Sequence, residues 1–222
     1  MKKLKMSSFF SIMIILGMFL CVPGFAGATS VVYDNTGASY GFWAGQIIGD
    51  GITLAGTDRF VTEFMFGYKL TLRSEQNPTS QTATVRFYNN DGIEGAPSTL
   101  LWQSESFSID EGDHDVTLPV SFIEVPNTFI WTVQFNDYDD NIFNYSGKYR
   151  RPVVVGSSTD WIWGMYSSGW TKLYITDGET GDFLYAKVTA ASSTNVPEPS
   201  VGLLLCLGLA AIVRGKRIFK KL

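Results

Sequence analysis

The sequence predicts an all-β fold, an antiparallel two-sheet β-sandwich of jelly-roll type, for the central part of this 222-residue chain. Apolar and polar residues alternate with a period of two in several segments, and Gly, Asn, Asp and Pro separate these segments at short intervals. No convincing 3.6-residue period occurs between residues 29 and 195, so nothing supplies the crossover helices of a parallel α/β fold. A closed β-barrel is the alternative.

The N-terminus has the three regions of a secretory signal peptide. Three lysines lie in the first five residues, an apolar run follows from about residue 9 to residue 20, and the small residues Ala26, Gly27 and Ala28 end the segment. This pattern predicts a signal helix in residues 1–28. The Sec translocation machinery would export the protein, and the signal peptide would be cleaved off between Ala28 and Thr29. An uncleaved membrane anchor is the alternative.

The body, residues 29–191, carries the strand pattern most clearly in four segments. In residues 60–72, the even positions are mainly aromatic or aliphatic, and the odd positions include Glu63. The same period recurs in residues 83–88, 129–135 and 184–188. A period of two indicates a strand with one buried face. It predicts that Trp131 lies in the core and that Arg86 lies on the polar side of its strand.

The net charge of −4 averages over three unlike parts of the chain. Residues 29–195 hold nine of the 17 basic and 20 of the 21 acidic residues, which gives them a net charge of −11. Such a body repels phosphate backbones, so nucleic acid is not expected as a partner. Both cysteines, Cys21 and Cys206, lie outside it, which excludes a disulfide framework, a cysteine nucleophile and a thiolate metal site there.

The C-terminal residues 192–222 follow a different pattern. A polar spacer precedes the motif at residues 196–200, an uncharged apolar run occupies residues 201–213, and residues 214–222 are basic. The run predicts a single transmembrane helix of marginal length, because even residues 196–213 would span only about 27 Å as a helix, against a hydrocarbon core of about 30 Å. The Lys and Arg residues place the tail in the cytoplasm. A permanent anchor is the alternative to processing.

This ending resembles the PEP-CTERM sorting signal of Gram-negative bacteria. The resemblance implies that an exosortase, a membrane transpeptidase with a cysteine nucleophile, recognises the motif, cleaves near it and discards the tail. The motif residues are Val196, Pro197, Glu198 and Pro199. The two prolines hold Glu198 in an extended conformation. The resemblance also implies transient anchoring in the inner membrane, then a place on the cell surface or in the extracellular matrix, often in bacteria that make exopolysaccharide.

A second resemblance covers most of the body. Five segments are similar to a β-rich ectodomain that recurs in PEP-CTERM proteins, and no activity is implied by it. They are residues 49–64, 85–92, 95–102, 129–135 and 169–173.

Two acidic clusters offer oxygen ligands of the kind that Ca²⁺ requires. The first contains Asp110, Asp113 and Asp115, and the second contains Asp137, Asp139 and Asp140. Neither has the spacing of an EF-hand loop. The expectation is therefore either a structural Ca²⁺ at one of them, with no other cofactor, or solvated acidic turns.

Four aromatic residues lie in a Gly/Ser-rich stretch, where they could be exposed. Trp161, Trp163, Tyr166 and Trp170 would then stack on sugar rings and form a carbohydrate contact. Packing of these side chains in the core or against loops is the alternative.

Catalytic machinery is not apparent. The single histidine, His114, and the cysteine-free body cannot supply a three-His metal site or a Cys–His pair. The sequence therefore predicts an exported, non-enzymatic surface or matrix protein. A carbohydrate-binding module acting on exopolysaccharide is the first alternative. A secreted hydrolase is the second, because a glycosidase needs only two carboxylates.

Overall fold

The computed structural model describes residues 28–37, 41–72, 81–136, 143–150, 153–174 and 183–193. Within these ranges the chain forms fourteen strands and one short 3-10 segment, η1 (Ile93–Gly95). No helix in the described ranges is long and apolar enough to cross a membrane. The predicted transmembrane helix at residues 201–213 lies outside them, as does the predicted signal helix up to residue 27.

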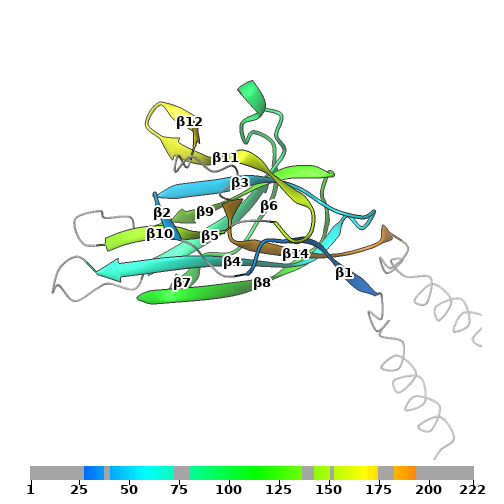
Figure 1. The fold of residues 1–222 in the computed structure, drawn as a ribbon, viewed down its shortest axis with the longest axis horizontal. Coiled ribbons are helices and arrows are strands. Elements are labelled where there is room, and N and C mark those ends of the chain that lie inside the picture. The colour runs from blue at the N-terminus through cyan, green and yellow to red at the C-terminus, as the bar shows by residue number, and fades with distance from the viewer. Residues whose placement is uncertain are drawn as a thin grey trace, which may run out of the picture. The chain divides into compact units, whose positions relative to one another are not determined.

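The strands pair into two sheets, and the pairings between described strands are antiparallel (Figure 1). The first sheet has the order β1-β14-β4-β10-β13, with β8 paired to β4 and β2 paired to β10. Its strands are β1 (Thr29–Asp34), β2 (Gly41–Ala44), β4 (Phe60–Leu72), β8 (Gly112–Glu124), β10 (Phe143–Arg150), β13 (Phe183–Leu184) and β14 (Ala186–Ala191).

The second sheet has the order β12-β11-β3-β9-β5-β6, with β7 also paired to β5. Its strands are β3 (Ile47–Thr53), β5 (Gln81–Tyr88), β6 (Leu100–Gln103), β7 (Phe107–Ile109), β9 (Thr128–Phe135), β11 (Ser157–Tyr166) and β12 (Gly169–Leu173). The predicted all-β fold of two antiparallel sheets is confirmed, and its jelly-roll type stays a prediction.

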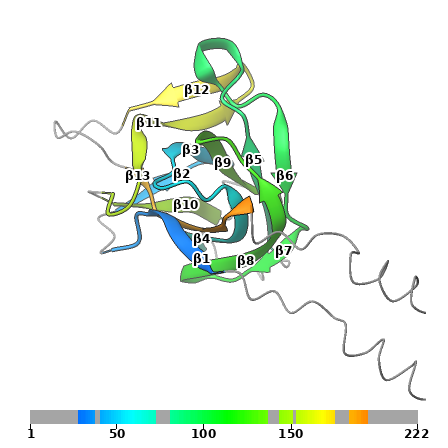
Figure 2. The same cartoon turned by 90° about the vertical axis from the view of Figure 1, so that its right-hand side faces the viewer.

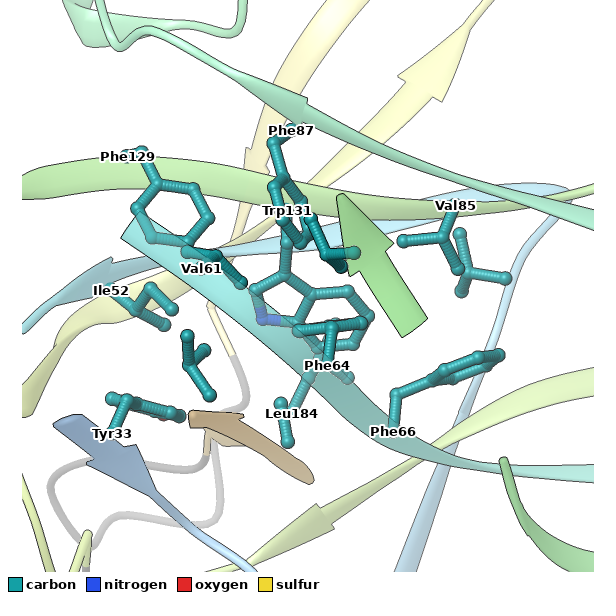
Figure 3. Packing of buried hydrophobic residues seen from close by; sticks show 14 of the residues in the cluster. Tyr33, Ile52, Val61, Phe64, Phe66, Val85, Phe87, Phe129, Trp131 and Leu184 are labelled. Atoms are coloured by element: carbon teal, nitrogen blue, oxygen red, sulfur yellow. The ribbon is translucent and has the colours of Figure 1, made fainter. Parts of the chain in front are cut away.

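The core lies between the sheets and contains the side chains of inward parity. The Phe64 ring of β4 lies 5.1 Å, centroid to centroid, from the rings of both Phe87 in β5 and Trp131 in β9 (Figure 3). Trp131 is 1% exposed, and the other two are fully buried. Aromatic side chains bury the largest apolar areas, so this cluster dominates the packing of sheet on sheet. The predicted core position of Trp131 is confirmed.

A buried carboxyl group connects the two sheets. Asp50 of β3 is fully buried. Its Oδ1 accepts a hydrogen bond from Ser158 Oγ at 2.6 Å, and its Oδ2 accepts one at 3.0 Å from the backbone N–H of Leu184, in the first sheet. Burial raises the pKa of Asp50 to about 8, although these hydrogen bonds act in the opposite direction. The carboxyl group therefore keeps its proton at neutral pH.

Candidate functional site

A row of side chains crosses the outer face of the second sheet. In β5, β9 and β11, residues such as Phe87, Trp131 and Ile162 point into the core, so the residues between them point outward. One outward residue from each strand lies directly opposite the next across the sheet, and together these residues form the row. From β12 to β6 they are Lys172, Trp163, Gly49, Thr132, Arg86 and Gln103. A basic residue thus stands near each end of the row, with an indole and a hydroxyl group between them.

Over this face, the edge strand β12 of the second sheet approaches β5 and the η1 segment that follows it. Three strands separate β12 from β5, yet the rings of Trp170 and Tyr88 lie 6.2 Å apart. The Lys172 ammonium group also lies 3.7 Å from the carboxylate of Glu94 in η1, which follows β5. Figures 1 and 2 show this connection beside the β11–β12 hairpin. Trp163 and Thr132 are therefore buried, although their side chains point away from the core between the two sheets.

The hairpin tryptophans are partly covered by the chain itself. The Lys172 ammonium group lies 4.8 Å from the Trp161 ring centroid and 5.5 Å from that of Trp163, which is the geometry of a cation–π contact. Trp161 also packs against Tyr174, at 6.4 Å between centroids, and Tyr174 is 57% exposed. The aromatic surface left open to a ligand therefore lies toward Tyr174 and Trp170 rather than at Trp163.

The four aromatic residues predicted to contact sugar do not form one group. Trp161, Trp163 and Trp170 share the outer face, and Trp163 is only 3% exposed. Tyr166 is exposed, but its side chain lies on the opposite face of the hairpin, the face toward which a side chain at Gly164 would point. The Tyr166 ring lies there, because a Cβ built on Gly164 would be 3.0 Å from it. Trp163 lies next to Gly49 in the row and is covered in part by the Lys172 side chain.

Arg86 is held on the same face by two neutral amide groups. Its Nε donates to Gln103 Oε1 at 2.7 Å, and its Nη1 donates to Gln134 Oε1 at 2.6 Å. Among the described residues, no carboxylate pairs with this guanidinium group. Beside it, Asn136 Nδ2 donates to hydroxyl groups of Thr82, Thr84 and Ser106. This part of the sheet is a fixed polar surface with a single positive charge.

Two of the three residues in the first acidic cluster lie in a strand, while Asp110 lies in the connection between β7 and β8. Asp113 and Asp115 are part of β8, where they pair with Lys69 and Gly67 of β4. Strand alternation sends His114 to the other face, and its ring lies 5.4 Å from that of Tyr68. The cluster was expected in a turn, because Gly and Asp dominate its composition. Asp110 lies between two strands as expected, but for Asp113 and Asp115 pairing with the long strand β4 outweighs that local preference.

The partner of Asp113 and Asp115 is an ammonium group. Lys148 of β10 forms an ion pair with Asp113, and a second with Asp115 at 2.6 Å, while Tyr185 Oη donates to Asp115 at 3.1 Å. Burial lowers the pKa of Lys148, but the two carboxylates outweigh it and raise the pKa above its ordinary value. A Cβ at Gly67 would lie 2.5 Å from Lys148 Cδ, so the glycine leaves the space that this side chain crosses.

Only some of the predicted Ca²⁺ ligands are among the residues that the structure describes. In the described ranges, no three His, Cys, Asp or Glu side chains converge as a metal site requires, and Asp110 does not join Asp113 and Asp115 in such a group. Asp137, Asp139 and Asp140 lie outside the described residues. A Ca²⁺ site at the second cluster stays a prediction.

The processing residues fall at or beyond the ends of the described chain. Thr29 begins β1 and Ala28 precedes it, whereas Ala26 lies outside the described residues. Val196, Pro197, Glu198 and Pro199 also lie outside them.

The described chain is thus an antiparallel β-sandwich with a partly aromatic, partly polar outer face. No family model matches the sequence, and no curated protein matches it. A solved structure of the clostridial cysteine protease Cwp84, after propeptide cleavage, is similar in fold, with a TM-score of 0.51 and 10% sequence identity. The match covers 74% of this chain and 40% of the protease chain. At that identity the likeness shows the fold alone.

Several residues of this face could not be located from sequence. Arg86 has the predicted outward parity, but its position beside Thr132, and that of Lys172 beside Trp163, depend on strand register. The contact between Tyr88 and Trp170 depends on the curvature of the sheet. The buried Asp50, which faces the first sheet and not this surface, has no sequence signal beyond its place in a turn-like Gly-Asp-Gly triplet.

Proposed function

We propose that the protein is exported, is sorted and processed through its C-terminal PEP-CTERM signal by an exosortase, and serves without enzymatic activity on the cell surface or in the extracellular matrix. The observation that carries this proposal is the order of features in the last 31 residues: a polar spacer, the Val-Pro-Glu-Pro motif, a short apolar run and a basic tail. The signal-peptide pattern before Thr29 supports export.

The non-enzymatic part of the proposal rests on the composition of the body. Residues 29–195 contain no cysteine, so the nucleophile implied by the name of the similar protease is absent from them. Asp113 and Asp115 lie together, but they hold the ammonium group of Lys148 and so are not free to act as an acid and a base.

The fate of the basic tail tests the sorting proposal. Processing removes residues 214–222, whereas a permanent anchor keeps them. Protein recovered from the surface of the native host is therefore expected to lack the tail, and a Glu198→Ala variant is expected to keep it and to stay in the membrane fraction.

A second candidate function is carbohydrate binding through the outer face of the second sheet. The observation that favours it is the presence on this face of the accessible aromatic side chains Trp161, Trp170 and Tyr174, together with the amides that fix Arg86. Aromatic faces next to oriented polar groups are the usual composition of a sugar site.

Substitution of Trp170 tests the second candidate. Trp170→Ala removes a partly exposed ring that packs on Tyr88 and leaves the main core untouched. The wild-type protein is expected to bind members of a glycan array, and the variant is expected to lose that binding. Thr171→Ala, at an exposed position on the same strand, is the matched control. Equal binding by Trp170→Ala and the wild type would contradict the assignment of the site.

A further inference from the structure

We propose that the Arg86 end of this outer face binds the carboxylate of an acidic sugar, so that the ligand class is a polysaccharide containing uronic acids. The proposal rests on the second candidate function, carbohydrate binding, and names the class of sugar. It is argued from the donors of Arg86, from a buried hydroxyl group beside it and from the neighbouring rings.

The guanidinium group of Arg86 is oriented but not neutralised. It has five N–H donors, and the two glutamine contacts occupy one on Nε and one on Nη1. The remaining donors, including both on Nη2, have no acceptor among the described residues. Because both glutamine acceptors are uncharged, the positive charge is left for a ligand. A planar fork that is fixed in position is the arrangement that recognises a carboxylate with two hydrogen bonds.

Thr132 supplies a second and independent observation. It is the direct register partner of Arg86, its side chain lies on the same face, and it is fully buried. Its hydroxyl oxygen has no hydrogen-bond partner. Buried hydroxyl groups in proteins are nearly always paired, so an unpaired one beside a free guanidinium group indicates a polar group that the folded chain itself does not supply.

Aromatic rings complete the site on the side toward β12. Tyr88 lies two residues along β5 from Arg86 on the same face and is edge-on to Trp170. Burial raises the pKa of Tyr88 above its ordinary value, and the charge of Arg86 acts in the opposite direction. A sugar ring carrying a carboxylate can therefore pack on the Tyr88–Trp170 pair while its acid group meets Arg86.

The acidity of the body does not oppose this assignment. Asp113 and Asp115 lie on the first sheet, in β8, and Lys148 neutralises part of their charge. Packed sheets lie about 10 Å apart, and charges are screened over about 8 Å at physiological ionic strength. On the outer face of the second sheet, Glu94 is paired with Lys172, so it does not cancel the charge of Arg86.

The test uses full-length protein in non-ionic detergent and three immobilised polymers. These are polygalacturonate, the same polymer with its carboxylates methyl-esterified, and polyglutamate. We expect binding to polygalacturonate to be at least about tenfold tighter than to the ester, and Arg86→Gln to lose that difference. Arg86→Lys, which keeps the charge but not the fork, is expected to recover only part of it. Lys187→Gln removes the same charge from β14 of the first sheet and is expected to change nothing.

Each other outcome overturns the proposal in a distinguishable way. Equal binding of the acid and the ester, unchanged in Arg86→Gln, would contradict the acidic ligand and leave carbohydrate binding intact. Equal binding of polyglutamate would show recognition of carboxylates in general and not of an acidic sugar. Failure to bind either sugar polymer, in protein whose circular dichroism spectrum is that of a β-protein, would contradict the acidic ligand, and failure to bind any member of the glycan array as well would contradict the carbohydrate-binding function.

Discussion

Replacing Phe64 with alanine should lower the free energy of unfolding by about 3–5 kcal/mol, the range for removal of a buried phenylalanine ring. The side chain is fully buried at the centre of the interface between the sheets, where its ring contacts those of Phe66, Phe87 and Trp131. The alanine variant leaves a cavity that these rigid rings cannot fill without leaving their own positions. Urea unfolding followed by tryptophan fluorescence measures the change.

Tyr174→Ala is the matched control for this experiment. It removes a ring of similar size from a side chain that is 57% exposed, and the expected loss of stability is below about 1 kcal/mol. A Phe64→Ala variant as stable as the control would contradict the packing of the two sheets described here.

Stability should fall as the pH rises from about 5 to about 8, because of Asp50. Its pKa is about 8 in the folded protein and near 3.8 when the chain is unfolded. In this interval the folded protein binds one more proton than the unfolded chain. Each pH unit then costs about 1.4 kcal/mol, and the loss is complete above the folded pKa. Urea midpoints at pH 5, 6, 7 and 8 measure the slope.

Asp50→Asn should remove most of this pH dependence. The asparagine is nearly isosteric with the protonated acid, and its oxygen can still accept the hydrogen bond from the Leu184 backbone while its amide faces Ser158. We expect a nearly flat stability profile between pH 5 and pH 8. Parallel profiles for the variant and the wild type would show that folded Asp50 is already ionised at pH 5, so that burial does not raise its pKa as described here.

The fold was largely predictable because a single physical rule produces most of it. A strand that buries one face must alternate, and residues 60–72 and 129–135 alternate strongly, so their strands and the core position of Trp131 followed from the pattern. The rule failed at Asp113 and Asp115, where local composition favours a turn and pairing with β4 makes a strand.

The candidate site was less predictable because it depends on distant pairings. The alternation of residues 83–88 gives the outward side of Arg86, but not its neighbours. Four strands from different parts of the chain, β11, β3, β9 and β5, must align before Arg86, Thr132 and Trp163 share a row. The burial of Trp163 needs a further step, the approach of η1 to β12, which no local pattern records. Hydrophobic composition alone made Trp163 indistinguishable from the exposed aromatic residues near it.

The intact mass of the mature protein from the native host tests the central claim most directly. Export and sorting predict a chain that begins at Thr29 and ends near Val196–Pro199, without the basic residues 214–222. The Glu198→Ala variant is the internal comparison and should show the mass of a chain that begins at Thr29 and still ends at Leu222. A wild-type mass that includes the basic tail, in protein recovered from the cell surface or the matrix, would contradict the proposal.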